Sequence, residues 1–195
     1  MGNLGSIVNM IKKIGSSSTV SSRISDVENA DKLILPGVGA FDHGITHLNE
    51  LGLIPALSKK VKQLKTPILG ICLGMQLFTL KSEEGRLPGL GWLEAETIKF
   101  NLKDPKLKIP HMGWNDVSYN PESKLFGGLG ENPRFYFVHS YHVVCKDKSD
   151  ECATTIYEKP FTSSVQKENI CGVQFHPEKS HRFGLQLLKN FIEKS

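Results

Sequence analysis

The sequence predicts an α/β fold with a mainly parallel central sheet, flanking helices, and antiparallel strands in its second half. In the first half, short apolar runs alternate with segments of helical spacing, which is typical of a parallel sheet covered by helices on both faces. In the second half, short strand-like segments follow one another, and we expect several to pair antiparallel. The 195 residues suit one domain, 1–195, because neither a linker nor a repeat interrupts them.

The elements of the first half are predicted from hydrophobic spacing and from the residues that end it. Apolar residues recur every three or four positions from Leu4 to Ile14, and Gly15 then stops the helix. In order, we predict a helix over 4–14, a weak strand over 18–22, a strand over 32–35, helices over 43–51 and 54–65, a strand over 67–71 and a helix from 73 to about 81.

The second half is predicted mainly from runs that favour strands. We predict strands over 92–100, 134–145, 152–157, 162–166 and 170–176, and then an amphipathic helix over 181–192. Pro177 has no N–H to donate, which suits the end of the last strand.

The start of the chain departs from this pattern. A doubly wound sheet normally begins with a strand that becomes interior, whereas here a helix begins almost at Met1. Without that strand, backbone groups beside its place in the sheet would be unpaired. We therefore hypothesise that the first strand is missing from this sequence, and that roughly six to ten upstream codons encode it. A stop codon immediately upstream of Met1 would contradict this hypothesis.

Composition and charge argue against several classes of function. The formal charge of +4 is too small and too dispersed to indicate a nucleic-acid partner, and no apolar run approaches the ~20 residues of a membrane-spanning helix. The cysteines show no Cys-x-x-Cys spacing, which argues against zinc and a disulfide framework. His43 and His47 lack the companion residues of a metal pair. We predict no metal, no cofactor and a cytoplasmic location, where a working thiol stays reduced.

Cys72 is the strongest candidate for a catalytic residue. The apolar run 67–71 leads into it, Gly70 and Gly74 stand two residues away on each side, and a helix is predicted to follow. This is the sequence form of a nucleophile elbow, a tight strand-to-helix turn that presents a reactive side chain. The N-terminus of the following helix favours the thiolate over the thiol.

His176 and Glu178 are the candidates for a base and for the residue that orients it. Side chains two residues apart on a strand share a face, so both can point towards one site. A thiol nucleophile needs such a base, and the base needs an orienting partner. A buried structural cysteine with an unrelated histidine is the alternative, but the elbow, the His-x-Glu pair and their order in the chain favour catalysis.

A glycine-rich turn is the candidate for stabilising the oxyanion that forms in acyl transfer. Gly37, Val38 and Gly39 follow a predicted strand, so we expect them at the same edge of the sheet as Cys72. One of their backbone N–H groups and the N–H of Leu73 are the candidate donors. An ordinary glycine-rich turn is the alternative, and the segment is too short to be identified as a phosphate loop.

Several blocks of the sequence resemble the class I (triad) glutamine amidotransferases, whose fold is flavodoxin-like. The elbow and the Phe175–Glu178 segment carry the general likeness. The full set is similar to the family of glutaminase subunits (HisH type) of imidazole glycerol phosphate synthase. Its blocks appear in family order, span nearly the whole chain, and are residues 36–41, 70–76, 82–85, 110–115, 136–141 and 172–180.

The resemblance implies a glutaminase that releases ammonia from glutamine. In the family pattern, Cys72 forms a γ-glutamyl thioester, His176 acts as base and then protonates the leaving ammonia, and Glu178 orients His176. A carboxylate such as Glu84 suits the α-ammonium group of glutamine. The resemblance assigns glutamine binding to Gln76, Glu84, Tyr136, His139, Ser140 and Tyr141. Ordinary surface or core positions are the alternative for each of these.

The resemblance also implies a partner. Members of the family work with a (β/α)8-barrel cyclase subunit, which uses the ammonia to make imidazole glycerol phosphate and an aminoimidazole carboxamide ribotide (AICAR) in histidine biosynthesis. The positions expected at the interface are Met112, Trp114, Asn115 and Lys179, with a core position as the alternative for Trp114. Partner binding stimulates the family's activity, and the 37–39 segment is the candidate switch.

Three alternative functions stay open at this point. Residues 84–97 also resemble paralogous glutaminases of surface-polysaccharide gene clusters, which supply ammonia for amidating a sugar through a different barrel subunit. A partner-independent thiol hydrolase acting on γ-glutamyl compounds would share the elbow and the histidine. An inactive partner-binding module would fit if the missing strand disrupts the active site. Neighbouring genes, and turnover with and without a barrel subunit, distinguish these.

Overall fold

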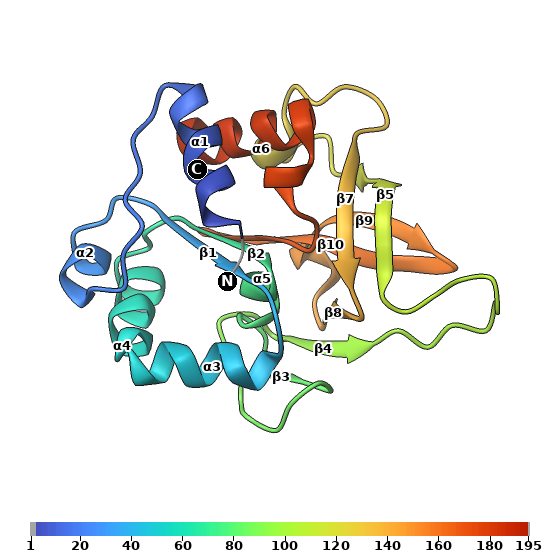
Figure 1. Ribbon diagram of the computed structural model, residues 1–195, viewed down its shortest axis with the longest axis horizontal. Coiled ribbons are helices and arrows are strands. Elements are labelled where there is room, and N and C mark those ends of the chain that lie inside the picture. The colour runs from blue at the N-terminus through green and yellow to red at the C-terminus, as the bar shows by residue number, and fades with distance from the viewer. Residues whose placement is uncertain (1–2, 195) are drawn as a thin grey trace.

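A nine-stranded sheet runs through the part of the chain that the computed structural model describes, residues 3–194 (Figure 1). The strands of both sheets are, in chain order, β1 (Leu33–Gly37), β2 (Ile68–Cys72), β3 (Lys81–Ser82), β4 (Ala95–Lys99), β5 (His111–Asp116), β6 (Ser118–Tyr119), β7 (Arg134–His139), β8 (Tyr141–Cys145), β9 (Glu151–Tyr157), β10 (Lys159–Lys167) and β11 (Ile170–Val173). β5 and β7 form a separate two-stranded sheet. The α-helices are α1 (Leu4–Ile14), α2 (Ile24–Glu28), α3 (Phe41–Glu50), α4 (Leu53–Ser58), α5 (Leu73–Gln76) and α6 (His181–Lys194).

Both predicted kinds of strand pairing are present, and the predicted α/β class is confirmed. β1, β2 and β11 pair in parallel, and the sheet continues through β10, β8 and β4 with antiparallel pairs. The carboxyl ends of β1, β2 and β11 therefore lie at one edge of the sheet. Gly37 faces Cys72 in the register of β1 and β2, and the chain after Val173 leaves β11 at the same edge.

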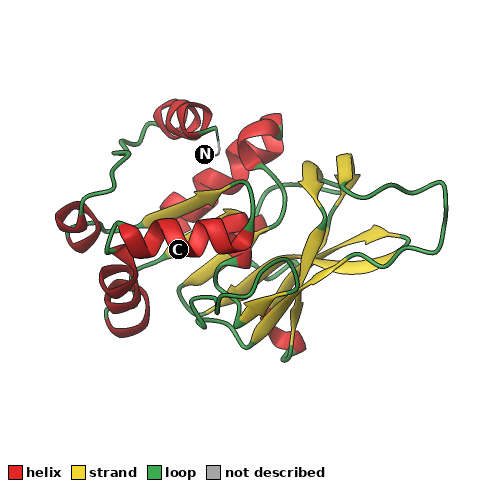
Figure 2. Cartoon of the chain, turned by 60° about the horizontal axis from the view of Figure 1, so that its bottom comes forward, coloured by secondary structure: helices red, strands yellow, loops and turns green. Residues whose placement is uncertain are grey.

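Helices cover both faces of the parallel strands. Figure 1 shows α1 and α6 on one side and α3 and α4 on the other, and Figure 2 shows the antiparallel strands extending beyond these helices. Side chains of β2 alternate between the two layers, since Leu69 and Ile71 join the core under α1 and α6 while Ile68 joins the core under α3 and α4. Burial on both faces explains why β2 reads in the sequence as a continuous apolar run.

The first predicted helix is confirmed as α1. The Asn3 side chain accepts a hydrogen bond from the Ser6 N–H at its start, and Gly15 adopts a φ of 91° at its end. These are the two capping arrangements that stabilise helix termini, and the second one favours glycine.

The strand predicted over 18–22 is wrong, because the structure has no strand there. The Ser21 hydroxyl donates to Asp26 and accepts a hydrogen bond from the Arg23 N–H, so its polar groups are satisfied locally. Serine side chains compete with sheet pairing in this way. The short helix α2 follows directly and was not predicted.

The helix predicted from 73 to about 81 is also wrong in length, because α5 ends at Gln76. The Thr79 hydroxyl donates to the Gln76 carbonyl, and the Leu80 N–H donates to the Ala95 carbonyl beside β4. Backbone groups that would continue the helix are thus used in the sheet. Within residues 3–194, no helix combines the length and the apolar character needed to cross a membrane.

Candidate active site

Cys72 lies at the turn from β2 into α5 and has a strained backbone. Its φ is 55° and its ψ is −114°, a conformation that residues with a Cβ rarely adopt. The turn has no room for side chains, since a Cβ at Gly74 would lie 1.8 Å from the Leu35 carbonyl oxygen and one at Gly70 would lie 2.7 Å from the Met75 nitrogen. The glycines that predict a nucleophile elbow are therefore required by close packing around Cys72.

His176 and Glu178 form a buried pair close to this turn. His176 Nδ1 lies 2.8 Å from Glu178 Oε1, and the two side chains are 3% and 2% exposed. The predicted reason for their meeting is wrong, because β11 ends at Val173 and Glu178 lies in a 3-10 turn, Pro177–Lys179. That turn brings the carboxylate back to the ring, which leaves Nε2 as the nitrogen available to the sulfur and to a substrate.

Burial and two neighbouring groups set the pKa of His176. Burial disfavours the charged ring and lowers the pKa, but Cys72 and Glu178, through hydrogen bonding and charge, raise it to about 9. Nε2 makes no hydrogen bond with any described residue, so it is free to contact a substrate. The ring is therefore protonated at neutral pH.

Two buried glutamines connect Cys72 to β8. The Nε2 group of Gln76 donates to the Tyr141 carbonyl at 3.1 Å and to Gln174 Oε1 at 3.0 Å. The Nε2 group of Gln174 donates to Cys72 Sγ at 3.7 Å. Sequence reasoning names Gln76 but misses Gln174. The signal that would have found Gln174 is its place two residues before His176 in the strand predicted over 170–176, because side chains at that spacing on a strand share a face.

The candidate oxyanion donors lie next to the elbow. Gly37 pairs with Cys72 in the sheet, and a Cβ at Gly37 would lie 2.9 Å from the Leu73 Cβ. Gly39 has a φ of 100°, which favours glycine, and the Val38 side chain is partly exposed. The turn thus passes the start of α5 at van der Waals distance. The assignment of individual N–H donors stays a prediction.

Glu84 is held at the start of α3. Its Oε2 accepts a hydrogen bond from the N–H of Phe41, the first residue of α3, at 2.8 Å. The Asp42 carboxylate accepts hydrogen bonds from the N–H groups of Arg86 and Leu87. These contacts fix the 82–87 turn on the positive end of the helix that directly follows the glycine-rich turn.

The two residues of β7 that the sequence assigns to glutamine binding lie on different faces of that strand, and their assignment stays a prediction. Tyr136 and His139 are three positions apart, so they lie on opposite faces of the strand. Tyr136 is half-buried and packs between Trp114 and Lys179, with ring centroids 6.1 Å apart for the aromatic pair and the Lys179 Nζ 5.1 Å from the Tyr136 ring. His139 is 6% exposed and points into the interior.

Ser140 and Tyr141 accept hydrogen bonds through their backbone carbonyls. The Ser140 carbonyl accepts one from the Phe100 N–H at 3.1 Å, and the Tyr141 carbonyl is the acceptor for Gln76. The assignment of both residues to glutamine binding stays a prediction, in which Tyr141 acts by holding Gln76.

A pair of buried histidines lies beside the Tyr141 carbonyl. His139 Nδ1 is 2.7 Å from that oxygen, and His139 Nε2 is 3.0 Å from His111 Nδ1. The Asn115 amide nitrogen is 3.3 Å from His111 Nε2 and donates to the Ile156 carbonyl at 2.9 Å. Because carbonyl oxygens only accept, Asn115 donates to His111, His111 to His139, and His139 to Tyr141. Both ring nitrogens of His139 are thus used within the protein.

The two histidines of this pair are neutral at physiological pH. Burial lowers the pKa of His111 to about 4 and, against a raising contribution from the Tyr141 carbonyl, lowers that of His139 to about 3. Among the described residues, no carboxylate raises the pKa of either ring, in contrast to the site of His176.

The predicted interface residues divide between the surface and the interior. Met112 and Trp114 point outward from β5, with 62% and 39% of their surface exposed. Lys179 is exposed and lies over the ring of Tyr136 beside Trp114. Asn115 points the other way, towards His111.

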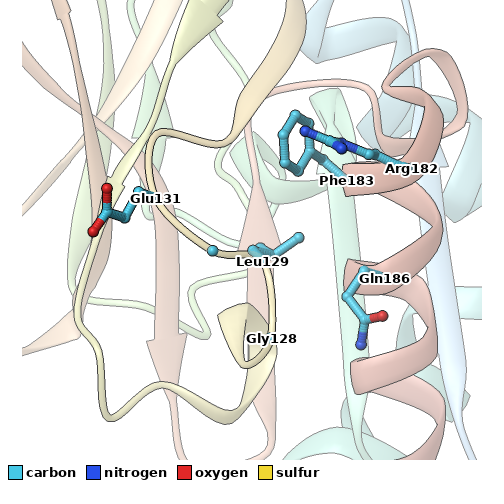
Figure 3. A pocket seen from close by; sticks show the side chains of 7 residues that line it. Gly128, Leu129, Glu131, Arg182, Phe183 and Gln186 are labelled. Atoms are coloured by element: carbon cyan, nitrogen blue, oxygen red, sulfur yellow. The ribbon is translucent and has the colours of Figure 1, made fainter.

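An open hollow of about 370 Å³ lies apart from these residues, between the turn before β7 and the start of α6 (Figure 3). It is lined by Gly128, Leu129, Gly130, Glu131, Arg182, Phe183 and Gln186. None of the predicted catalytic or glutamine-binding residues lines it. Residues 3–194 contain no group of three or more His, Cys, Asp or Glu side chains placed to hold a metal ion.

Comparison with known proteins adds the family to this geometry. The model of the glutamine amidotransferase class-I family matches residues 2–195. The chain is 60% identical over 195 residues to imidazole glycerol phosphate synthase subunit HisH 2 of Methanococcus maripaludis, an alignment covering 100% of this chain and 96% of that protein. It is 48% identical over 193 residues to subunit HisH 2 of Pseudomonas aeruginosa, covering 99% and 95%.

Solved structures show the same fold at low sequence identity. A glutamine amidotransferase structure gives a TM-score of 0.72 at 20% identity, over 98% of this chain and 93% of that one. A glutamine amidotransferase from Thermotoga maritima gives a TM-score of 0.68 at 16% identity, over 96% and 90%. The predicted fold of the class I amidotransferases is therefore confirmed.

Proposed function

The chain belongs to the class I glutamine amidotransferases, and from this premise we propose that it is the HisH-type glutaminase subunit of an imidazole glycerol phosphate synthase, acting in histidine biosynthesis. It hydrolyses glutamine to glutamate and ammonia and delivers the ammonia to a (β/α)8-barrel cyclase subunit. The observation that carries the proposal is the strained turn at Cys72 beside the buried His176–Glu178 pair. A cytoplasmic location belongs to the same proposal, since a working thiol requires a reducing compartment.

The chemistry is an acyl transfer in two steps. The Cys72 thiolate bonds to the side-chain amide carbon of glutamine, and N–H groups at Leu73 and in the Gly37–Gly39 turn stabilise the oxyanion. The C–N bond then breaks as His176 gives its proton to the leaving nitrogen, which departs as ammonia. His176 next takes a proton from the water that attacks the thioester, so that glutamate leaves and the thiolate and imidazolium are restored.

Gln76 and Glu84 are the residues that we assign to the amino-acid end of glutamine. Gln76 is buried one helical turn after Cys72, and Glu84 lies at the start of α3 beside the glycine-rich turn. A carboxylate there would bind the α-ammonium group through a charge-assisted hydrogen bond, which is strong once water is excluded. We assign His139 a supporting role, because both of its ring nitrogens are used within the protein.

The docking surface for the barrel is formed by Met112, Trp114, Tyr136 and Lys179. An exposed methionine and tryptophan are the side chains that anchor interfaces, and a lysine held over a tyrosine ring adds a positioned charge. Tyr136 also connects this surface to the site, because its carbonyl accepts a hydrogen bond from the His176 N–H at 2.8 Å. Ammonia released near His176 therefore emerges close to the proposed interface.

A paralogous function in amidating a sugar is the second candidate. The resemblance of residues 84–97 to such glutaminases favours it. The glutaminase chemistry would be unchanged. Coupling to a barrel subunit from a polysaccharide gene cluster, and not to the histidine-pathway cyclase, would support this candidate.

The Cys72→Ala variant tests the proposal. We expect loss of glutamine hydrolysis on the order of 10⁴-fold or more, because no other group replaces the sulfur. Cyclisation by the barrel subunit with ammonium salt as nitrogen source should persist in the complex with this variant. Glutamate release and product formation are measured with and without the barrel. Undiminished glutaminase would refute the assignment of Cys72.

The same assays separate the remaining alternatives with the wild-type chain. Partner-independent turnover of γ-glutamyl peptides would favour a thiol hydrolase. Tight binding of the barrel without any glutaminase would favour an inactive binding module.

A further inference from the structure

Gln174 lies between the nucleophile and Gln76, and the proposed mechanism does not use it. Its side chain is fully buried. Its Oε1 is 3.0 Å from Gln76 Nε2, and its Nε2 is 3.7 Å from Cys72 Sγ. Its backbone N–H donates to the Ser163 carbonyl at 2.9 Å, so the chain that carries it is held by β10.

The hydrogen bonds around Gln76 determine which way the Gln174 amide points. The Tyr141 carbonyl oxygen can only accept, so the atom of Gln76 that contacts it is the NH₂ group. The same NH₂ group contacts Gln174, which must therefore present its oxygen to Gln76. The NH₂ group of Gln174 is then directed at Cys72. The Tyr141 carbonyl does not contact the sulfur, yet it determines that Gln174 presents its NH₂ group to Cys72.

A donor aimed at this sulfur has a chemical consequence. A thiolate accepts hydrogen bonds more strongly than a thiol does, so a fixed N–H favours the ionised form. The titratable neighbours of Cys72 are His176 and, behind it, Glu178. Gln174 is a neutral donor, so unlike His176 it keeps its hydrogen throughout the reaction.

The far end of this arrangement is also fixed. The Tyr141 carbonyl that holds Gln76 accepts a second hydrogen bond from His139, and His139 is held by His111. Gln76 therefore cannot turn without breaking its hydrogen bonds to the Tyr141 carbonyl and to the buried Gln174. A side chain anchored in this way gives Gln174 a rigid support from which to hold the sulfur.

We propose that Gln174 is a positioning residue for the glutaminase reaction, whose amide holds the Cys72 sulfur and the substrate residue Gln76 in one hydrogen-bonded unit. The proposal rests on the proposed function, since it assigns Gln174 to the reaction of the same site. It commits to two separable effects: the N–H on Cys72 acts on the nucleophile, and the oxygen on Gln76 acts on substrate binding.

Two substitutions separate these effects. Gln174→Glu keeps an oxygen for Gln76 but removes the amide donor to Cys72, so we expect kcat to fall about tenfold or more with little change in KM. Gln174→Met is similar in length and removes both contacts, so we expect a comparable fall in kcat together with a rise in KM. Gln166 offers the matched control, since it lies on β10 and bonds to Ser123 and Cys152 instead. Gln166→Met should leave kcat and KM unchanged.

The pH dependence of Cys72 alkylation gives a readout that a purely structural role would not move. Iodoacetamide reacts with the thiolate, so its rate as a function of pH reports ionisation at Cys72 in the folded chain. We expect the midpoint to shift upward by about one pH unit or more in both Gln174 variants and not in Gln166→Met. Mass spectrometry of the alkylated peptide and the Cys72→Ala variant establish that this sulfur is the one followed.

The outcomes distinguish failure of this proposal from failure of the proposed function. If both Gln174 variants fold, as judged by their thermal unfolding, and keep the wild-type kcat and alkylation profile, Gln174 is not a positioning residue. If the wild-type chain hydrolyses no glutamine with or without a barrel subunit, the proposed function fails. The alkylation profiles then still decide whether Gln174 acts on the sulfur, because they require no turnover.

Discussion

His176 and His139 are both buried histidines at the edge of the same site, yet their pKa values move in opposite directions. Burial lowers the pKa in both places. At His176 the Cys72 sulfur and the Glu178 carboxylate reverse this and raise the pKa to about 9. His139 is hydrogen-bonded to a carbonyl and to the neutral ring of His111, and its pKa falls to about 3. Burial alone therefore keeps a histidine neutral, so that it serves only to connect hydrogen-bonding partners. A charged neighbour is needed to keep the ring protonated, so that it can act as an acid.

The raised and the lowered histidine pKa values also affect the stability of the fold in opposite pH ranges. The raised pKa of His176 contributes stability that is fully present below about pH 6.5 and is lost as the pH rises through about 9. The lowered pKa values of His111 and His139 contribute stability that is present above about pH 6.5 and is lost as the pH falls towards about 4 and about 3. Buried histidines thus reduce the stability of the folded state both at high pH and at low pH.

Exchanging each histidine in turn gives the largest expected contrast. His176→Gln removes the proton donor and acceptor, so we expect kcat for glutamine hydrolysis to fall on the order of 10³-fold. His139→Asn keeps a donor for the Tyr141 carbonyl and should reduce kcat less than about tenfold. Steady-state kinetics in the complex with the barrel measure both. Equal losses of kcat in the two variants would contradict the view that His176 transfers a proton while His139 only holds a hydrogen bond.

Removing the charge beside His176 sharpens the comparison. Glu178→Gln leaves a neutral partner on Nδ1, as at His139, so we expect the pKa of His176 to fall and kcat to drop on the order of a hundredfold or more. The pKa of the His176 ring is measured by NMR of the labelled imidazole. Asp150→Asn is the matched control, because it neutralises a buried carboxylate that pairs with Lys167 instead. A His176 pKa that stays near 9 in Glu178→Gln would contradict the attribution to this carboxylate.

The lowered pKa values of His111 and His139 are tested by the dependence of stability on pH. Below about pH 6.5, His111 and His139 bind protons in the unfolded chain but stay neutral in the folded chain, so the free energy of unfolding falls as the pH is lowered. His139→Asn removes one of these groups, and we expect a shallower fall. Urea unfolding from about pH 7.5 to about pH 4.5 measures the slope. His47→Asn changes an exposed histidine and should leave the slope unchanged. An unaltered slope in His139→Asn would show that His139 does not titrate as described.

β2 and the turn at Cys72 could be predicted because their signals are local. β2 is buried on both faces and therefore reads as an apolar run, and the glycines around Cys72 stand where a Cβ would collide with neighbouring atoms. The same locality explains why the helix α1 was predicted with both of its ends.

The rest depends on contacts between residues distant in sequence. α5 ends early because Leu80 pairs with Ala95, and the buried histidine pair forms only because β5 and β7 align His111 with His139 across 28 residues. No spacing rule within a short window records such a register. Gln174 is an exception, because its spacing from His176 within the predicted strand 170–176 is a local signal.

The smallest expected effect concerns Lys179, which lies over the ring of Tyr136, on the face of β7 opposite to His139. Lys179→Ala removes an exposed cation–π contact worth about 0.5–1 kcal/mol, so folding should change little. We expect a several-fold loss in the stimulation of glutaminase by the barrel subunit, because the Tyr136 carbonyl also holds the His176 N–H. Lys189→Ala alters an exposed lysine on α6 that pairs only loosely with Glu193, and should leave stimulation unchanged. Normal coupling in Lys179→Ala would remove Lys179 from the docking surface and leave Met112 and Trp114 as its anchors.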